Sequence, residues 1–127
     1  MTLHAASLAG YGDATRATGM PRDVEYRVFS QVTGRLSQAL RDDAPFSELA
    51  AALHDNARLW TVLSVDLARP ENELPEALRA QLISLGIFMR RHTDQVLRGE
   101  AEAGVIVDIN TAIMRGLRGQ LSAAEGA

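Results

Sequence analysis

The segment from residue 74 to 117 constrains the fold most, because it contains a helical pattern with apolar residues on two opposite faces. At the roughly 100° per residue of an α-helix, one narrow arc holds Leu78, Leu82, Leu85, Met89, His92 and Val96. Ile83 and Ile87 lie almost across from that arc. A helix that is apolar on two sides is expected to lie between two other elements. One of them is either a second helix of this chain or another protein, and the pattern favours neither.

The composition predicts a single all-α domain over residues 1–127. Hydrophobic residues make up 46% of the chain and aromatic residues only 5%, so the core is expected to consist of Leu, Ile, Val and Ala. The four prolines lie at apparent segment boundaries and β-branched runs are few, which favours helices over strands. Residues 1–20 and 119–127 are expected to be flexible, and any helix within 3–19 is expected to be short and frayed.

Local signals predict where the helices begin and end. Pro21 and Pro75 each occupy a first-turn position, where a proline loses no hydrogen bond and the acids that follow favour the positive end of the helix. Ser47 is expected to cap the second helix, and Gly99 is expected to end the third. The predicted helices are 21–41, 47–69, 75–98 and 106–118. Their short connections predict a small antiparallel helical bundle of four main helices.

The charge and apolar patterns argue against several classes of protein. The chain has 13 basic and 16 acidic residues, which gives a net charge of −3. It lacks the concentrated basic face of a nucleic-acid binder. No apolar run approaches the roughly 20 residues of a membrane span, and the first residues lack the pattern of a secretory signal. The chain is therefore expected to be soluble and cytoplasmic, without membrane insertion. It has no cysteine, so disulfide and thiolate chemistry are absent.

No group of residues predicts an enzyme, a metal site or a cofactor. His4, His54 and His92 are scattered, and no two of them share a helical face as a zinc-binding pair would. His92 lies on the main apolar stripe of its helix, where a histidine with a satisfied ring is expected rather than a ligand. The serines and aspartates form no nucleophile motif.

Three residues on apolar stripes are candidates for specific contacts. A buried Asn56 must find partners for its amide, either within the bundle, where it fixes helix register, or in a partner protein; the first is favoured. Glu25 is expected to pair with Arg58 or Arg79. Trp60, the only tryptophan, is expected to be a core anchor rather than an interface hot spot.

Nearly the whole chain carries a resemblance to one known family. The resembling segments are PRDVEYRVFSQVTGRL (21–36), HDNARLWTVLSVDLARPENELPEALRAQLISLGIFMRRHT (54–93), and VLRGEA with VIVDINTAIMRGL (within 96–117). From about residue 11 to 118 the sequence resembles the FlaF family of small flagellar proteins of alphaproteobacteria. The motif residues, structural in our interpretation, are Glu25, Asn56, Trp60, Pro75, His92, Asp108 and Asn110. The family has no catalytic motif to carry over.

The resemblance implies a non-enzymatic protein that regulates flagellin synthesis and acts as a flagellin secretion chaperone, in opposition to or alongside a second regulator, FlbT. It further implies that flagellin has terminal segments that are disordered in the monomer and form amphipathic helices in the filament. A chaperone would cover such a helix by helix-in-groove docking. We expect Ile83, Ile87, Arg90 and Asp94 to form part of that groove. The oligomeric state stays open.

The alternative is a post-transcriptional regulator that acts on flagellin mRNA, or through FlbT, without stable flagellin binding. Arg90 and Arg91, with Arg115 and Arg118, could contact phosphates. Recognition of single-stranded RNA usually adds stacking aromatic side chains, and the aromatic residues here are dispersed along the chain. Direct contact with nucleic acid is therefore not expected.

Overall fold

The computed structural model describes the backbone of residues 22–126 and the side chains of residues 26–116. Within this range the chain forms four helices and no strand. They are α2 (Arg22–Arg41), α3 (Phe46–Leu67), α4 (Glu76–Leu97) and α5 (Gly104–Gly126). The prediction of a small all-α bundle is confirmed. The short helix expected within 3–19 lies outside the described residues.

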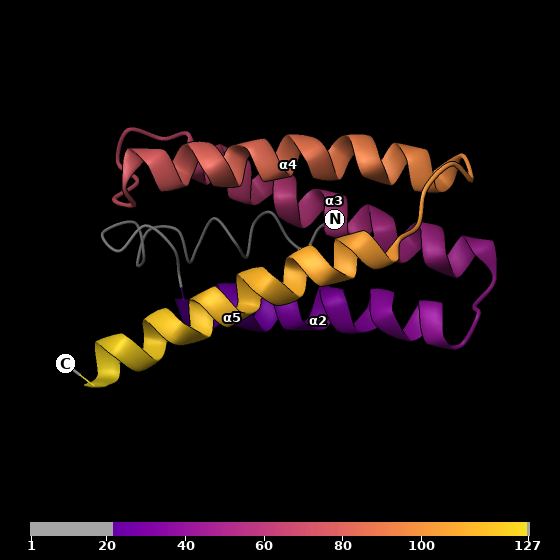
Figure 1. Ribbon diagram of the computed structural model, residues 1–127, viewed down its shortest axis with the longest axis horizontal. Helices are drawn as coiled ribbons and strands as arrows, with labels where there is room; N and C mark the ends of the chain where they lie inside the picture. Colours follow the sequence, from indigo (N-terminus) through magenta and orange to yellow (C-terminus); the bar gives the residue numbers. More distant parts are fainter. Residues whose placement is uncertain (1–21, 127) are drawn as a thin grey trace.

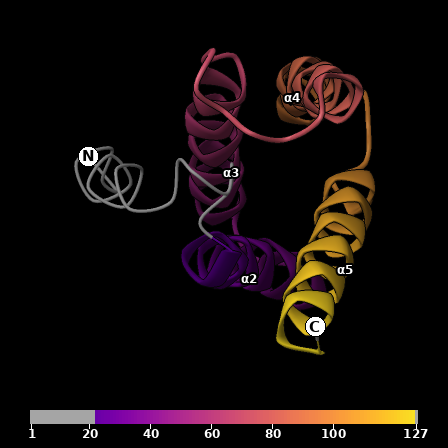
Figure 2. The same cartoon turned by 90° about the vertical axis from the view of Figure 1, so that its left-hand side faces the viewer.

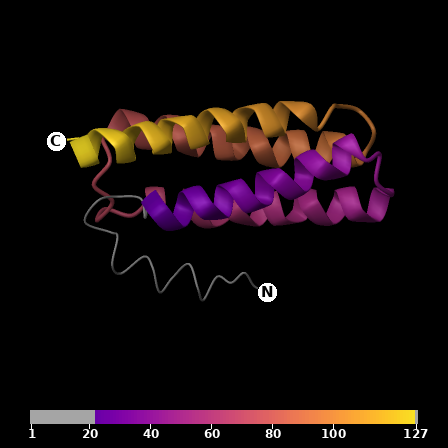
Figure 3. The same cartoon turned by 90° about the horizontal axis from the view of Figure 1, so that it is seen from below.

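Each helix runs antiparallel to the one before it (Figure 1). α2 packs against both α3 and α5, and α4 packs against α3. Seen end-on, the four helices surround a common interior (Figure 2). α2 and α5 form one layer and α3 and α4 the other, and the view from below looks onto the first of these layers (Figure 3).

Prolines begin both helices of the α3–α4 layer. Pro45 has φ −55° and ψ 151°, and Pro75 has φ −54° and ψ 143°, so both are extended residues directly before a helix. The prediction that Ser47 caps α3 is wrong, because α3 begins at Phe46 and makes no side-chain cap hydrogen bond. The proline ring fixes φ, so the helix begins at the next residue and Ser47 already lies in its first turn.

A residue in the left-handed region ends α2 and α4 in the same way. These residues are Asp43, with φ 50°, and Gly99, with φ 76°. The next residue in each case donates its N–H to the carbonyl five positions back, at 2.9 Å after Asp43 and 2.8 Å after Gly99. This pattern is the Schellman motif. The prediction that Gly99 ends its helix is confirmed.

The last helix is longer than the sequence predicted. It begins at Gly104 instead of 106 and continues to Gly126, past the expected end at 118. No proline follows Pro75 in the sequence, so nothing removes a helical hydrogen bond in this stretch. Ala123 and Ala124 are good helix formers, so the helix continues through the segment that we expected to be a flexible tail.

A hydrogen-bonded polar cluster crosses the centre of the bundle. The Asn110 amide on α5 donates to Asn56 Oδ1 at 2.7 Å and to Thr33 Oγ1 at 3.0 Å. Its Oδ1 accepts the indole N–H of Trp60 at 2.9 Å. Asn56 in turn places its own Nδ2 3.9 Å from the sulfur of Met89 on α4. One side-chain network therefore joins all four helices.

Apolar side chains enclose this network. Trp60 is buried and meets Phe29 edge-to-face, with ring centroids 5.7 Å apart. The other buried apolar residues are Val32, Leu36, Ala52, Leu53, Leu59, Leu63, Leu67, Leu82, Met89, Val96, Ala103 and Ile106. Because no water reaches Asn56 or Asn110, each amide depends on its protein partners, and a lost partner leaves a buried polar group unpaired.

A first prediction compares the two helix ends that have a residue in the left-handed region. Asp43→Gly should stabilise the fold by about 1 kcal/mol, because glycine adopts positive φ without the Cβ strain of an L-residue. Gly99→Ala should destabilise it by a similar amount for the opposite reason. Urea unfolding of both variants checks this pair. A lower stability of Asp43→Gly than of the native chain would contradict it.

A second prediction applies one substitution to two buried threonines. Thr33 and Thr93 are each 5% exposed, but Thr33 accepts a hydrogen bond from Asn110, whereas Thr93 Oγ1 has no partner among the described residues. Thr33→Val should cost about 1–3 kcal/mol, and Thr93→Val should be neutral or stabilising. Calorimetry of the two variants measures the difference. Equal losses at both sites would mean that the network does not contribute as described.

Candidate helix-binding groove

A groove of about 800 Å³ runs along the outer side of α3 and α4. Several apolar side chains that remain exposed to solvent line it. Val65 on α3 is 58% exposed and Ile87 on α4 is 52% exposed, and Leu97 lies further along α4. Exposed apolar side chains gathered in one concave site are typical of a binding surface.

Small residues let α3 and α4 approach each other at the base of the groove. A Cβ atom at Gly86 would lie 2.5 Å from Ser64 Oγ and 3.7 Å from Cε3 of Trp60. Only a glycine fits at this approach without a shift of Ser64. On the α3 side, the groove is lined by the small residues Ala50, Ala57 and Thr61 and also by the larger His54, Arg58 and Val65.

The connection between the two helices is held by polar contacts. Asn72 is buried and accepts the N–H of Leu74 at 3.0 Å, while its Nδ2 lies 3.3 Å from the carbonyl oxygen of Asp66. Arg79 on α4 donates to the carbonyl oxygens of Leu67 and Arg69 at the end of α3, at 3.3 and 3.4 Å. Carbonyls at a helix end lack intrahelical donors, so these bonds fix the start of α4 against the end of α3.

The four residues predicted to bind a partner all line this groove: Ile83, Ile87, Arg90 and Asp94. Ile83 is half-buried, and the other three are exposed. Among the described residues, no hydrogen bond or ion pair engages the side chain of Arg90 or Asp94. The core-facing arc of α4 is buried as predicted at Leu82, but no described helix covers Ile87.

The chain matches the sequence family described as flagellar protein FlaF over residues 7–117. It belongs to the FlaF family. The matched range contains the whole groove and every member of the central network. A search of curated proteins and a search of solved structures found no similar protein.

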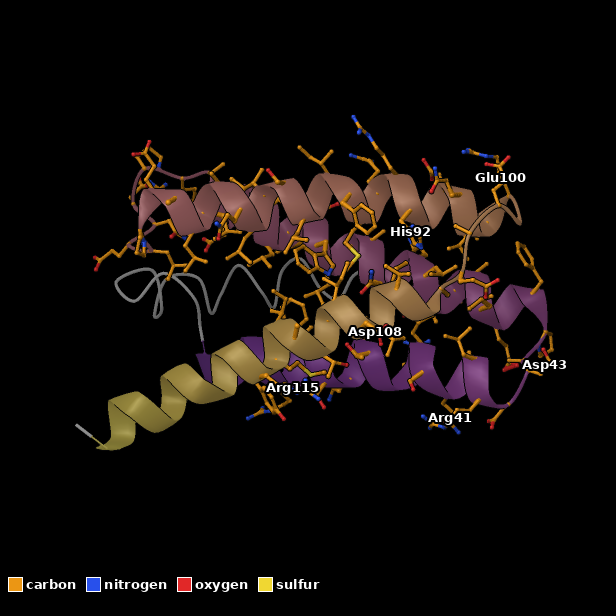
Figure 4. The ribbon with its side chains drawn as sticks, in the orientation of Figure 1. Arg41, Asp43, His92, Glu100, Asp108 and Arg115 are labelled. Atoms are coloured by element: carbon orange, nitrogen blue, oxygen red, sulfur yellow. The ribbon has the colours of Figure 1, made fainter. Side chains whose placement is uncertain are left out.

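His92, one of the FlaF motif residues, lies on a different side of α4 from the groove. Its Nε2 lies 2.7 Å from the carbonyl oxygen of Glu102, in the connection to α5. Its ring stacks on Phe88, with centroids 5.1 Å apart. Figure 4 shows His92 pointing from α4 toward that connection. The residue is half-buried with a partner for its ring, as expected for a structural histidine.

The other FlaF motif residues have separate locations. Asn56, Trp60 and Asn110 meet in the core network, whereas Asp108 lies exposed on α5 (Figure 4). The side chain of Glu25 lies outside the described side chains, so its expected pairing stays a prediction. Sequence reasoning missed Thr33 and Met89 as network members, and it also missed the α3 wall of the groove.

Clusters of metal ligands and membrane-spanning helices are both absent from the described residues. No group of three His, Asp or Glu side chains in this range could hold a metal ion. Within the same range, no helix is both long enough and apolar enough to span a membrane. The groove combines exposed apolar area with Arg90 and Asp94, neither of which has an ion-pair partner among the described residues, and this combination suits the binding of another chain.

The exposure of Ile87 generates a third prediction. Ile87→Asp should change the free energy of unfolding by less than about 0.5 kcal/mol, as surface substitutions usually do. The matched control is Leu82→Asp on the same helix, where the native side chain is only 6% exposed. That variant should unfold or become insoluble, because it buries an unpaired carboxylate. Thermal unfolding by circular dichroism measures both, and loss of the fold in Ile87→Asp would show that the bundle itself covers this face.

Proposed function

We propose that this member of the FlaF family is a non-enzymatic chaperone that binds flagellin and regulates its synthesis during flagellum assembly. The family match supports a role in the flagellum. The observation that carries the proposal is the groove between α3 and α4, whose Ile87 and Val65 are exposed. An amphipathic helix laid along it would cover these side chains, as in other helix-in-groove complexes.

The physical role of this binding is to shield flagellin before export. A flagellin segment that is disordered in the free subunit, and that forms an amphipathic helix in the filament, exposes apolar side chains until it is covered; in the groove it would present them as one apolar face. Docking in the groove would cover that face and keep the subunit from polymerising prematurely in the cytoplasm. A standard interface buries about 800 Å² on each partner, and most of its affinity comes from a few central residues. Ile83 and Ile87 are the central apolar residues we assign to this role.

Regulation of flagellin synthesis fits the same binding. A chain that binds free flagellin responds to the amount that awaits export, and it can pass that signal on through a protein contact, for example with FlbT.

No observation favours a direct contact with mRNA. Arg90 and Arg91 lie on α4. Arg115, labelled in Figure 4, lies on α5. The nearest described aromatic ring on α4, Phe88, is stacked on His92.

Flagellin binding by the native chain and two variants tests the proposal. Purified native chain should bind monomeric flagellin in isothermal titration calorimetry. Ile87→Asp should weaken that binding at least about tenfold, because docking would desolvate an unpaired carboxylate. The matched control is Phe46→Asp, which replaces an apolar side chain that is 62% exposed outside the groove, and it should bind as the native chain does.

Two results would contradict the proposal. One is the absence of flagellin binding to the folded native chain. The other is equal flagellin affinity of the native chain and of a folded Ile87→Asp variant, which would place the flagellin site elsewhere. Retention of flagellin mRNA by the purified chain, without flagellin, would favour the alternative of a post-transcriptional regulator.

A further inference from the structure

The groove side of α4 carries a regular repeat. Its residues Ile83, Ile87, Arg90, Asp94 and Leu97 are spaced by four, three, four and three positions. This alternation is the spacing of the contact positions in a coiled-coil heptad. None of the five is buried. α4 therefore has a second stripe, separate from the one in the core, that is arranged to contact a further helix.

The groove side of α3 carries the same repeat. Ala50, His54, Ala57, Thr61 and Ser64 are again spaced by four, three, four and three, and all five line the groove. None of these is buried either. Most are small, so a helix lying in the groove can approach α3 closely.

The two stripes together suit one additional helix. α3 and α4 are antiparallel, with Gly86 close to Ser64, so both stripes run along the same length of groove. From Ile83 to Leu97 the stripe on α4 rises about 21 Å, or about four helical turns. A helix of that length would make knobs-into-holes contacts with both neighbours.

The third and fourth residues of the α4 stripe, Arg90 and Asp94, are charged instead of apolar. Arg90 and Asp94 have no ion-pair partner among the described residues. Polar residues at contact positions of a coiled coil lower its stability but fix its register and its partner. The two side chains are four positions apart on one helix, a spacing at which opposite charges can pair, yet they make no ion pair with each other. Covering them without partners would therefore desolvate two unpaired charges. The favoured occupant therefore brings an acid to Arg90 and a base to Asp94.

We propose that the groove selects a heptad-patterned amphipathic helix of about four turns that carries an acidic and a basic residue four positions apart. The pair fixes the register of the helix and also its direction. If the helix lies parallel to α4, the acid precedes the base; if antiparallel, the base precedes the acid. This inference deepens the proposed function, because it rests on the same groove and describes how the partner is recognised there.

Two synthetic helical peptides test the selection by charge order. Both have about three heptads with leucine at the contact positions, except at two central positions four residues apart. One peptide has Glu then Lys at these positions, and the other has Lys then Glu. Each peptide should bind the native chain in the direction that its charge order sets, Glu-then-Lys parallel to α4 and Lys-then-Glu antiparallel, and this choice of direction should weaken in high salt. A spin label at the peptide N-terminus, read through broadening of the Ile83 and Ile87 methyl signals, measures the direction.

A double charge exchange in the protein provides the decisive variant. Arg90→Asp with Asp94→Arg should reverse the direction of both peptides while the fold stays intact. The matched control exchanges the exposed ion pair of Arg35 and Asp55, on the α2–α3 side of the bundle, and it should leave both directions unchanged. The same direction for both peptides, absence of binding by both, or unchanged directions in the Arg90/Asp94 variant would each overturn the inference.

The same variants separate this inference from the proposed function. If flagellin binds but the peptide order has no effect, selection by charge fails and the flagellin proposal stands. If the charge order of the peptide decides its direction but flagellin does not bind, the flagellin proposal fails and the selection stands. If the native chain is a dimer in analytical ultracentrifugation and the charge exchange makes it monomeric, a second copy occupies the groove, and the inference of a foreign helix is overturned.

Discussion

The Asn110 amide is the contact on which the arrangement of the four helices depends. From α5, Asn110 contacts Thr33 on α2 and both Asn56 and Trp60 on α3. Asn56 extends the network to Met89 on α4. Apolar packing alone tolerates alternative alignments of helices, whereas a buried amide is satisfied only when its partners lie at the right level. We infer that the network fixes one register for the bundle, in the way that a single buried asparagine fixes a coiled coil.

The fixed register determines what remains available on the surface. Trp60 belongs to the network and also lies beside Gly86, where α4 approaches Ser64 of α3 closely. With the core stripe of α4 turned inward toward this network, its second stripe around Ile87 faces solvent. The groove therefore follows from two properties of α4: an inner face held by the core, and an outer face that nothing in the described bundle covers.

Much of the fold could be predicted from sequence, because its signals are local. Prolines and Gly99 mark helix ends through backbone geometry, and the error at Ser47 arose where Pro45 supplied a stronger start signal than a capping side chain. Asn56 and Asn110 each lie on an apolar arc, which indicates burial, but periodicity does not show which amide meets which. The Ile83 and Ile87 wall of the groove was visible as an apolar face. The α3 wall was not, because alanine, threonine and serine give little periodic signal.

The central claim, that the outer face of α4 binds flagellin while the core does not change, can be tested through the isoleucine methyl groups. The chain has two isoleucines in the groove, Ile83 and Ile87, and three on α5, which are Ile106, Ile109 and Ile113. Methyl NMR spectra of isoleucine-labelled chain, recorded during titration with unlabelled flagellin, report on both regions at once. The methyl signals of Ile83 and Ile87 should shift or broaden first, while that of the buried Ile106 stays in place. Changes confined to the α5 isoleucines, with Ile83 and Ile87 unaffected at saturating flagellin, would contradict the account.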